Sequence, residues 1–170
     1  GDVVLLSELV DEVGRDAARF FFLMRSADTT LDFDLELAKQ QSAENPVYYV
    51  QYAHARICSI LRVAKESGVT IPSAGDADLS LLTHDSEVDL IKKLAELPDL
   101  IVEAGACYEP HRLTRYAQDL AAVFHKFYTE CRVVSEDKAF TAARLVLVDS
   151  TRTVLANTLG LLGISAPERM

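Results

Sequence analysis

Residues 45–68 read NPVYYVQYAHARICSILRVAKESG, and this stretch decides the fold class. Asn45 can accept hydrogen bonds from the first free amides of a helix, and Pro46 suits the first helical position because its ring already fixes a helical φ. The following residues place one apolar stripe at helical spacing, formed by Val50, Ile57, Leu61 and Ala64. We therefore predict a long helix that begins at Pro46, buries this stripe and ends near Gly68.

Shorter helices are predicted before this long one. Ser7 can cap a first helix that ends at Gly14, and residues 15–25 continue in helical composition. An alternation of apolar and acidic residues then favours a short extended stretch. The last residue of that stretch, Asp34, is placed to cap a helix over residues 35–41.

The remaining sequence predicts four more helices after a connecting segment. Residues 69–83 contain Pro, Gly, Ser and Asp in close succession, which is typical of a surface loop. Helices are predicted near Ser86, at Pro98, over residues 109–131 and over residues 139–162, with Gly163 after the last. We therefore predict an all-α protein in which residues 45–170 form a bundle of three long and two shorter helices. Residues 1–44 are predicted to be an extension packed beside that bundle.

The composition is that of an ordinary globular protein. The chain has 170 residues, of which 49% are hydrophobic and 25% are charged, enough for one domain with a short appendage. No window approaches the run of about 18 apolar residues that spans a bilayer. The first residues lack the basic segment followed by an apolar stretch that marks a leader. We expect a soluble, cytoplasmic protein.

The net charge of −9 is unevenly distributed along the chain. Residues 1–44 carry four basic against ten acidic side chains, and residues 76–109 carry two against nine. Residues 45–75 carry three basic against one acidic side chain, and residues 110–170 carry eight against six. A polyanionic partner should therefore meet the second and fourth of these segments, although an ordinary solvated surface gives a similar balance.

Residue clusters that could carry catalysis or bind a metal are sparse. Cys58, Cys107 and Cys131 are odd in number and stand in apolar helical contexts, which predicts reduced thiols in the core. His54 and Cys58 could supply two zinc ligands or a nucleophile pair, but no CxxC or HxxxH pair completes a site. The acidic run over residues 28–36 lacks the glycine of a calcium loop and favours a solvated turn. We predict no catalytic residue and no metal site in this chain.

One edge of the predicted long helix carries a pattern that suits nucleic acid. Tyr48, Tyr52 and Arg56 follow one another at i, i+4 and i+8 and therefore lie on one face. Aromatic and guanidinium planes beside a positive charge are how proteins hold unpaired bases. Packing of the same three side chains against the next helix is an equally good interpretation of the spacing.

The sequence closely resembles that of bacterial-type arginyl-tRNA synthetases. The most specific string is NPVYYVQYAHAR at residues 45–56. Further pieces agree in the same order: EVGRDAARFF at residues 12–21, LDFD at residues 31–34, AARL at residues 142–145 and SAPERM at residues 165–170. Together these pieces extend over essentially the whole chain.

The resemblance implies the C-terminal part of such a synthetase. Residues 1–44 resemble the end of the catalytic region with its junction helices, and residues 45–170 resemble the DALR anticodon-binding domain. The HIGH and KMSKS motifs of the family do not occur in the sequence. The implied parent enzyme is an arginine–tRNA ligase that uses ATP and Mg²⁺. The chain itself is expected to hold no cofactor and to be inactive, with the anticodon loop of tRNA(Arg) and the rest of the synthetase as partners, and to be a monomer.

The resemblance also names the residues that should meet the anticodon. Every arginine anticodon has C in its middle position, so one unpaired cytosine must be told from the other bases. The family pattern assigns this pocket to Tyr52, Arg56, Tyr128 and Met170. Arg169 could neutralise the α-carboxylate of Met170. Two alternatives stay open: a helical protein-interaction module, and the related bundle of a glycyl- or cysteinyl-tRNA synthetase. Binding through phosphates would weaken steeply with salt, whereas apolar helix docking would not.

Overall fold

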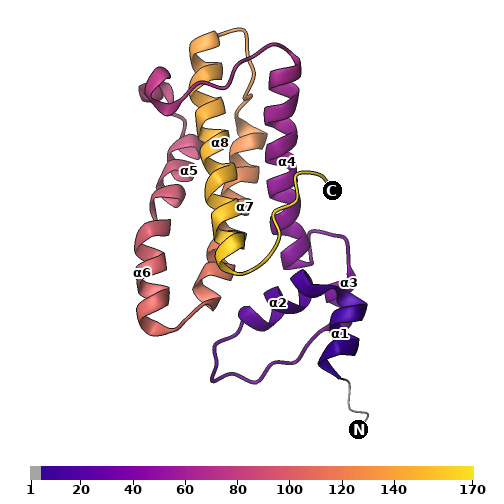
Figure 1. The fold of residues 1–170 in the computed structure, drawn as a ribbon. Helices are drawn as coiled ribbons and strands as arrows, with labels where there is room; N and C mark the ends of the chain where they lie inside the picture. Colours follow the sequence, from indigo (N-terminus) through magenta and orange to yellow (C-terminus); the bar gives the residue numbers. More distant parts are fainter. Residues whose placement is uncertain (1–4) are drawn as a thin grey trace.

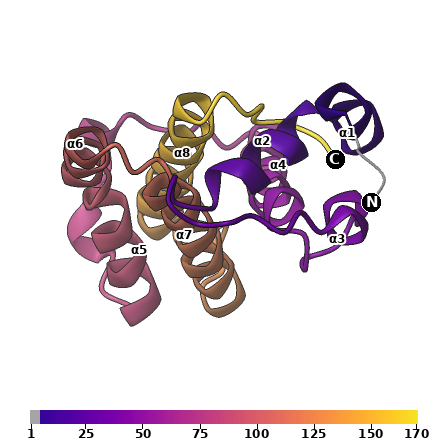
Figure 2. The ribbon, with the colours of Figure 1, turned by 90° about the horizontal axis from the view of Figure 1, so that it is seen from below.

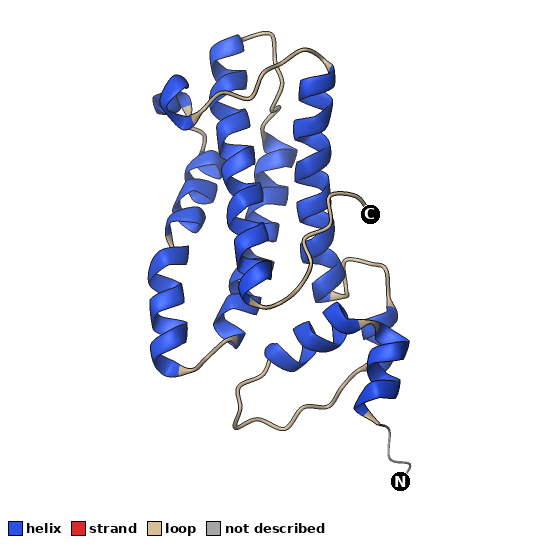
Figure 3. Cartoon of the chain, in the orientation of Figure 1, coloured by secondary structure: helices blue, strands red, loops and turns tan. Residues whose placement is uncertain are grey.

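The computed structural model describes residues 5–170, and this part of the chain is built from helices without any β-strand (Figures 1 and 3). Three long helices form the centre: α4 (Pro46–Glu66), α7 (His111–Glu130) and α8 (Lys138–Leu161). Two shorter helices, α5 (Asp85–Ala95) and α6 (Leu97–Cys107), pack beside them on the side away from α4 (Figure 2). The predicted all-α bundle of three long and two shorter helices is confirmed.

Local capping explains where the long helices begin. The Asn45 side chain accepts a hydrogen bond from the Val47 amide at 3.2 Å, as the sequence predicts. At α8, Asp137 accepts from the amides of Ala139 and Phe140 at 2.9 and 3.1 Å. Each cap satisfies amides that have no partner within the helix, a contribution of about 1 kcal/mol.

The N-terminal helices α1 (Leu6–Val13), α2 (Arg15–Leu23) and α3 (Leu35–Lys39) lie at the lower end of α4 (Figure 1). Asp34 caps α3 by accepting from the Leu37 amide at 2.9 Å, as predicted. The prediction that Ser7 caps α1 is wrong, because Ser7 lies inside the first turn. The amide of Leu5 is instead satisfied by the Glu8 carboxylate at 3.0 Å.

The segment between α4 and α5 contains two short 3₁₀ turns, η1 (Ala74–Asp76) and η2 (Leu79–Leu81). Asp78 stabilises the second turn by accepting from the Ser80 amide at 3.1 Å. The prediction of a loop over residues 69–83 is therefore confirmed, with these two turns as its only helical pieces among the described residues.

The core lies between the long helices and extends down to α2. The predicted stripe of α4 is buried in full. Helix α7 buries a stripe of its own at helical spacing, formed by Leu113, Ala117, Leu120, Ala121 and Phe124. Phe20 of α2 is also fully buried, which joins the N-terminal helices to the bundle. Each such large side chain contributes about 1.5–3 kcal/mol through removal of apolar surface from water.

The three cysteines are free thiols in different environments. Cys131 is buried, Cys58 is half-buried and Cys107 is exposed at the end of α6. The prediction that all three belong to the core is therefore wrong for Cys107, because the last turn of α6 turns that position to solvent. Within residues 5–170, no helix is both long enough and apolar enough to cross a membrane.

Candidate nucleic-acid interface

An open groove of about 1130 Å³ runs along α4, the end of α7, the α7–α8 connection and the C-terminal segment. All four site residues named from the sequence line this groove. Tyr52 and Arg56 come from α4, Tyr128 comes from α7, and Met170 comes from the segment after α8. Residues that are far apart in the chain therefore meet at one concave surface.

Arg56 connects the two tyrosines of the groove. Its guanidinium carbon lies 4.7 Å from the centre of the Tyr128 ring, and Nη1 donates a hydrogen bond to the Tyr52 hydroxyl at 3.3 Å. The rings of Tyr48 and Tyr52 are nearly parallel, with centroids 6.2 Å apart. The packing interpretation is confirmed for Arg56, which packs on Tyr128 of α7, whereas Tyr52 keeps 39% of its surface exposed. An exposed ring beside a fixed guanidinium can stack on an unpaired base.

His125 supports the aromatic side of the groove from behind. Its ring centroid lies 5.3 Å from that of Tyr49 and 6.4 Å from that of Tyr52. Burial, and after it the nearby charge of Arg56, lower the pKa of His125 below the ordinary histidine value. A neutral imidazole therefore packs against Tyr52 near pH 7 and adds no second positive charge next to Arg56.

Four arginines line the groove and give it a positive character. They are Arg56, Arg62, Arg132 and Arg169, against two acidic neighbours, Glu130 and Glu168. All four arginines come from the two net-positive segments of the chain, residues 45–75 and 110–170. The sequence reasoning did not identify Arg62 and Arg132 as site residues. Arg62 stands six residues after Arg56, a spacing that does not share a helix face, and nothing in the sequence around Arg132 indicates its position.

The C-terminal segment reaches the groove because α2 and α4 hold it by hydrogen bonds. Asp16 accepts from the Ser165 amide at 3.1 Å and from the Gln51 side-chain amide at 2.9 Å. The Gln51 amide also donates to the Ser165 carbonyl at 3.0 Å, and His54 Nδ1 donates to the Pro167 carbonyl at 2.8 Å. Burial acts to raise the pKa of Asp16, but the hydrogen bonds from Ser165 and Gln51 outweigh it and lower that pKa. We call this set, Asp16, Gln51, His54, Ser165 and Pro167, the tail clamp.

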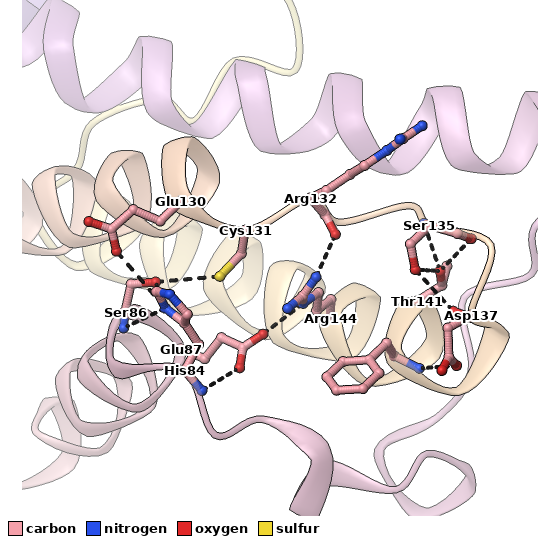
Figure 4. A network of polar contacts seen from close by, with 11 residues as sticks. His84, Ser86, Glu87, Glu130, Cys131, Arg132, Ser135, Asp137, Thr141 and Arg144 are labelled. Carbon is pink, nitrogen blue, oxygen red and sulfur yellow. Dashed lines mark hydrogen bonds and ion pairs between the residues drawn. The ribbon is translucent and has the colours of Figure 1, made fainter.

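The α7–α8 connection is held by an ion pair between Glu87 of α5 and Arg144 of α8 (Figure 4). Arg144 Nε donates to the carboxylate of the fully buried Glu87 at 2.7 Å, and Arg144 Nη1 donates to the Arg132 carbonyl at 2.8 Å. The second oxygen of Glu87 accepts from the His84 amide at 2.9 Å, which also caps α5. The Arg132 side chain points away from this pair toward α4 (Figure 4). We call Glu87 and Arg144 the buried strut.

Neither a metal site nor an activated nucleophile accompanies the groove in the described part of the chain. No three His, Cys, Asp or Glu side chains of residues 5–170 are grouped as metal ligands. His54 Nδ1 lies 3.8 Å from Cys58 Sγ, but the same nitrogen already donates to the Pro167 carbonyl. Burial raises the pKa of the Cys58 thiol, so it stays protonated at neutral pH.

A helical bundle with exposed tyrosine and arginine side chains in an open groove defines the class of helical domains that can hold unpaired nucleotides. The family model described as "DALR anticodon binding domain" matches residues 50–170. Because this match includes well over half of the chain, the protein belongs to the DALR anticodon-binding domain family.

Known proteins that are similar over the whole chain agree with this assignment. The arginine–tRNA ligase of Symbiobacterium thermophilum is 59% identical over 170 residues, which are 100% of this chain and 30% of that protein. The arginine–tRNA ligase of Heliobacterium modesticaldum is 58% identical over 174 residues, with 100% and 31% covered. The solved arginyl-tRNA synthetase of Thermus thermophilus superposes with a TM-score of 0.77 at 33% identity, covering 99% of this chain and 28% of that one. The resemblance seen in the sequence is confirmed, and the chain spans about a third of the length of its curated relatives.

Proposed function

We propose that this chain recognises the anticodon loop of tRNA(Arg) as part of an arginine–tRNA ligase. The remainder of that enzyme would attach arginine to tRNA(Arg), using ATP and Mg²⁺. The observation that carries the proposal is the meeting of Tyr52, Arg56, Tyr128 and Met170 around one positively charged groove. The family and the similar ligases support the same function. As part of this proposal, the protein is a monomer in the cytoplasm.

The groove suits a cytosine that is turned out of the loop. The exposed ring of Tyr52 offers a stacking surface, and the flexible, half-exposed side chain of Met170 can cover the base from the other side. The Watson–Crick edge of cytosine presents two acceptors, which suit the donors of Arg56. Uracil presents an N–H at the ring position where cytosine has an acceptor. An arginine facing uracil would therefore lose one partner and leave a buried donor unsatisfied.

The orientation of Arg56 is part of this proposed selectivity. Its contacts with Tyr128 and with the Tyr52 hydroxyl hold the guanidinium plane before the base arrives. Less rotamer freedom is then lost on binding, which favours affinity. The other arginines of the groove would neutralise phosphates of the loop, so binding should fall steeply with salt.

The test is a binding titration of the 170-residue chain with a tRNA(Arg) anticodon stem-loop and its middle-base variants. We expect the middle-C loop to bind more tightly than the middle-U and middle-A loops. Arg56→Ala should lose about 1–3 kcal/mol of binding and most of this discrimination. Tyr52→Phe should lose less, because the stacking ring is kept. Equal affinity for all middle bases, or binding that ignores salt, would favour a protein-interaction module instead.

A further inference from the structure

Helix α6 is apolar on two faces, and only one of them packs against the rest of the described chain. Leu97 and Ala104 are buried on the side where α6 packs against α7 and α5. A second set of apolar residues is exposed at the spacing of one helix face, i, i+3, i+4, i+7 and i+8. We call this set the outer stripe: Pro98, Ile101, Val102, Gly105 and Ala106. A surface helix ordinarily has polar residues at such positions, so the packing of this chain does not explain the outer stripe.

The exposure of this surface is large. Val102 keeps 70% of its surface exposed and Ile101 keeps 39%. Tyr108, which directly follows α6, is 89% exposed, more than any other large apolar side chain of residues 5–170. Exposed apolar residues that adjoin one another mark an interaction surface, whereas single ones are common on any protein.

Gly105 weakens α6 without a reason inside the chain. It stands within the helix, where glycine is less favourable than alanine. A Cβ atom at this position would meet no atom within 4 Å, and the φ angle of Gly105 is not positive. Neither a close neighbour nor a left-handed backbone therefore requires glycine here. On an exposed helix face, glycine lets a second backbone approach more closely than any other residue does.

Tyr108 is held in a strained conformation for the sake of its exposed ring. Its φ is 56°, in the left-handed region, and it is the one non-glycine residue with a positive φ among residues 5–170. Helices usually end in this conformation with glycine or asparagine, because a bulky side chain is disfavoured there. Tyrosine is also a residue type that contributes strongly to binding at protein interfaces. Strain of this kind is expected where a side chain serves binding rather than folding.

The charge around the outer stripe indicates the chemistry of its partner. Asp99 and Glu103 lie along one edge of the stripe on α6, and residues 76–109 carry two basic against nine acidic side chains. A second copy of this chain would bring the same negative charge to the same surface, which disfavours pairing. Five residues are also far fewer than the about 20–30 a side of a standard interface. A weak contact with one basic helix therefore fits this surface better than a stable dimer.

The outer stripe is remote from the groove. Helix α6 lies at one side of the bundle, whereas α4 and the C-terminal segment lie at the other side, with α7 and α8 between them (Figures 1 and 2). Helix α1 lies on the α4 side as well (Figure 2). RNA in the groove would therefore leave the outer stripe uncovered, and both surfaces could be occupied at once.

We propose that the outer stripe and Tyr108 form a docking surface for a helix of another protein, one with an apolar face bordered by lysine or arginine. The eight steps from the first to the last residue of the stripe extend about 12 Å, or two turns of a partner helix. The apolar face of that helix would cover the stripe, its backbone would come closest at Gly105, and its basic edge would meet Asp99 and Glu103. This inference does not rest on the proposed function.

The probe for this surface is a synthetic helical peptide of about 20 residues, with leucine on one face and lysine along both edges. A matched peptide carries glutamate in place of lysine. Fluorescence anisotropy at about 0.15 M salt measures binding while the long-range attraction of lysine to the net negative chain is screened. We expect the lysine peptide to bind at least about tenfold more tightly than the glutamate peptide. Equal affinities would overturn the proposed basic partner.

Val102→Asp separates docking on the stripe from attraction by charge alone. The change makes the chain more negative, so charge alone would tighten binding of the lysine peptide. Docking on the stripe predicts about tenfold weaker binding instead, because a carboxylate would be buried in an apolar contact. Leu6→Asp is the matched control, since Leu6 of α1 is 63% exposed and lies away from α6 (Figure 2). Weaker binding by Leu6→Asp but not by Val102→Asp would place the peptide on α1 and overturn the proposal.

Two further variants separate binding from folding. Gly105→Ala and Tyr108→Gly each remove a locally unfavourable residue, so both should keep or raise the melting temperature. They should nevertheless weaken the lysine peptide, about threefold for Gly105→Ala through lost close approach and about fivefold for Tyr108→Gly through the lost ring. Gly160→Ala is the control, because Gly160 is an exposed glycine of α8 where an added Cβ also meets open space. It should raise stability without changing peptide binding.

The remaining outcomes identify other occupants. Lower melting temperatures with unchanged peptide binding in Gly105→Ala and Tyr108→Gly would show that both residues serve the fold. Dimerisation in sedimentation equilibrium that Val102→Asp abolishes would assign the outer stripe to a second copy. If a longer ligase that contains this chain does not bind the lysine peptide, the remainder of that enzyme covers the stripe. Each of these results would overturn the proposed partner.

The inference and the proposed function fail separately, because the peptide titrations contain no RNA. Val102→Asp should bind the middle-C stem-loop like the unchanged protein, and saturating lysine peptide should not displace that loop. Displacement of the loop by the peptide would show that the peptide occupies the groove, and the outer stripe would then not be its docking surface.

Discussion

Replacement of Met170 by alanine separates a binding role of the C-terminal segment from a structural one. The Met170 side chain lines the groove, yet 55% of its surface is exposed. Truncation of a fully buried Met to Ala costs about 2–5 kcal/mol of stability. With more than half of the surface exposed, we expect a loss of at most about 1 kcal/mol, or roughly 2–4 °C in the melting temperature of a domain of this size.

The expected loss in binding is larger than this loss in stability. Stacking of a base on an aromatic ring is worth about 1–3 kcal/mol, and for the non-aromatic Met170 we expect the lower part of this range, about 1–2 kcal/mol, or about a fivefold to thirtyfold weaker complex. The loss should be greatest for the middle-C loop. Without the Met170 side chain the base is held more loosely, and cytosine then loses the hydrogen bonds from Arg56 that the other bases make less well. Fluorescence anisotropy with labelled middle-C and middle-U loops, and thermal melts of the same preparations, measure both quantities.

Leu161→Ala provides the control for the Met170 experiment. Leu161 is also 55% exposed, but it lies at the end of α8 and does not line the groove. Its truncation should cost a similarly small amount of stability and leave RNA binding unchanged. A Met170→Ala protein that melts many degrees lower, with unchanged discrimination between middle bases, would refute the reasoning and make Met170 a structural cap.

Two further predictions concern stability. Arg144→Leu leaves the buried Glu87 carboxylate without its partner, and we expect a loss of about 3–5 kcal/mol in the free energy of unfolding, measured with urea. A loss below about 1 kcal/mol would show that the buried strut does not hold the α7–α8 connection. Because the pKa of His125 is lowered in the folded state, the unfolded chain binds more protons below its own pKa of about 6.5. Stability should therefore fall as the pH drops from about 7 to 5, and His125→Phe should fall less; an unchanged pH profile in that variant would contradict the assignment.

The helix boundaries could be predicted because their causes are local. Asn45 and Asp34 each cap a helix that begins at the next residue, so a few neighbouring positions contain the whole signal. Ser7 failed for an equally local reason, since the Glu8 side chain reaches back and satisfies the Leu5 amide. Exposure of Cys107 depends instead on which side of α6 stays uncovered, and that is set by packing between helices rather than by the residues around it.

From residue spacing alone, only the site residues that lie on one helix could be predicted. Tyr52 and Arg56 stand four residues apart on α4, and their spacing alone placed them on one face. Tyr128 and Met170 were named through family resemblance, because no periodicity connects α7 or the C-terminal segment to α4. Arg132 was missed for the same physical reason. Its place depends on contacts with Arg144 that form only after α7 and α8 have packed.

The net negative charge of the chain is compatible with RNA binding. Some carboxylates, such as that of Asp16, do not line the groove but position the segments that form it. Asp16 belongs to a strongly negative segment, yet it binds Ser165 and Gln51 and thereby keeps the C-terminal segment at the groove.

Asp16→Ala makes the chain less negative, so long-range electrostatics alone would strengthen RNA binding. If the tail clamp positions the groove, the same change should weaken the middle-C loop several-fold and reduce its advantage over middle U. Asp99→Ala, an equal charge change at an exposed position of α6, should not weaken binding. Tighter binding by both variants would mean that charge, and not the position of the C-terminal segment, governs the affinity.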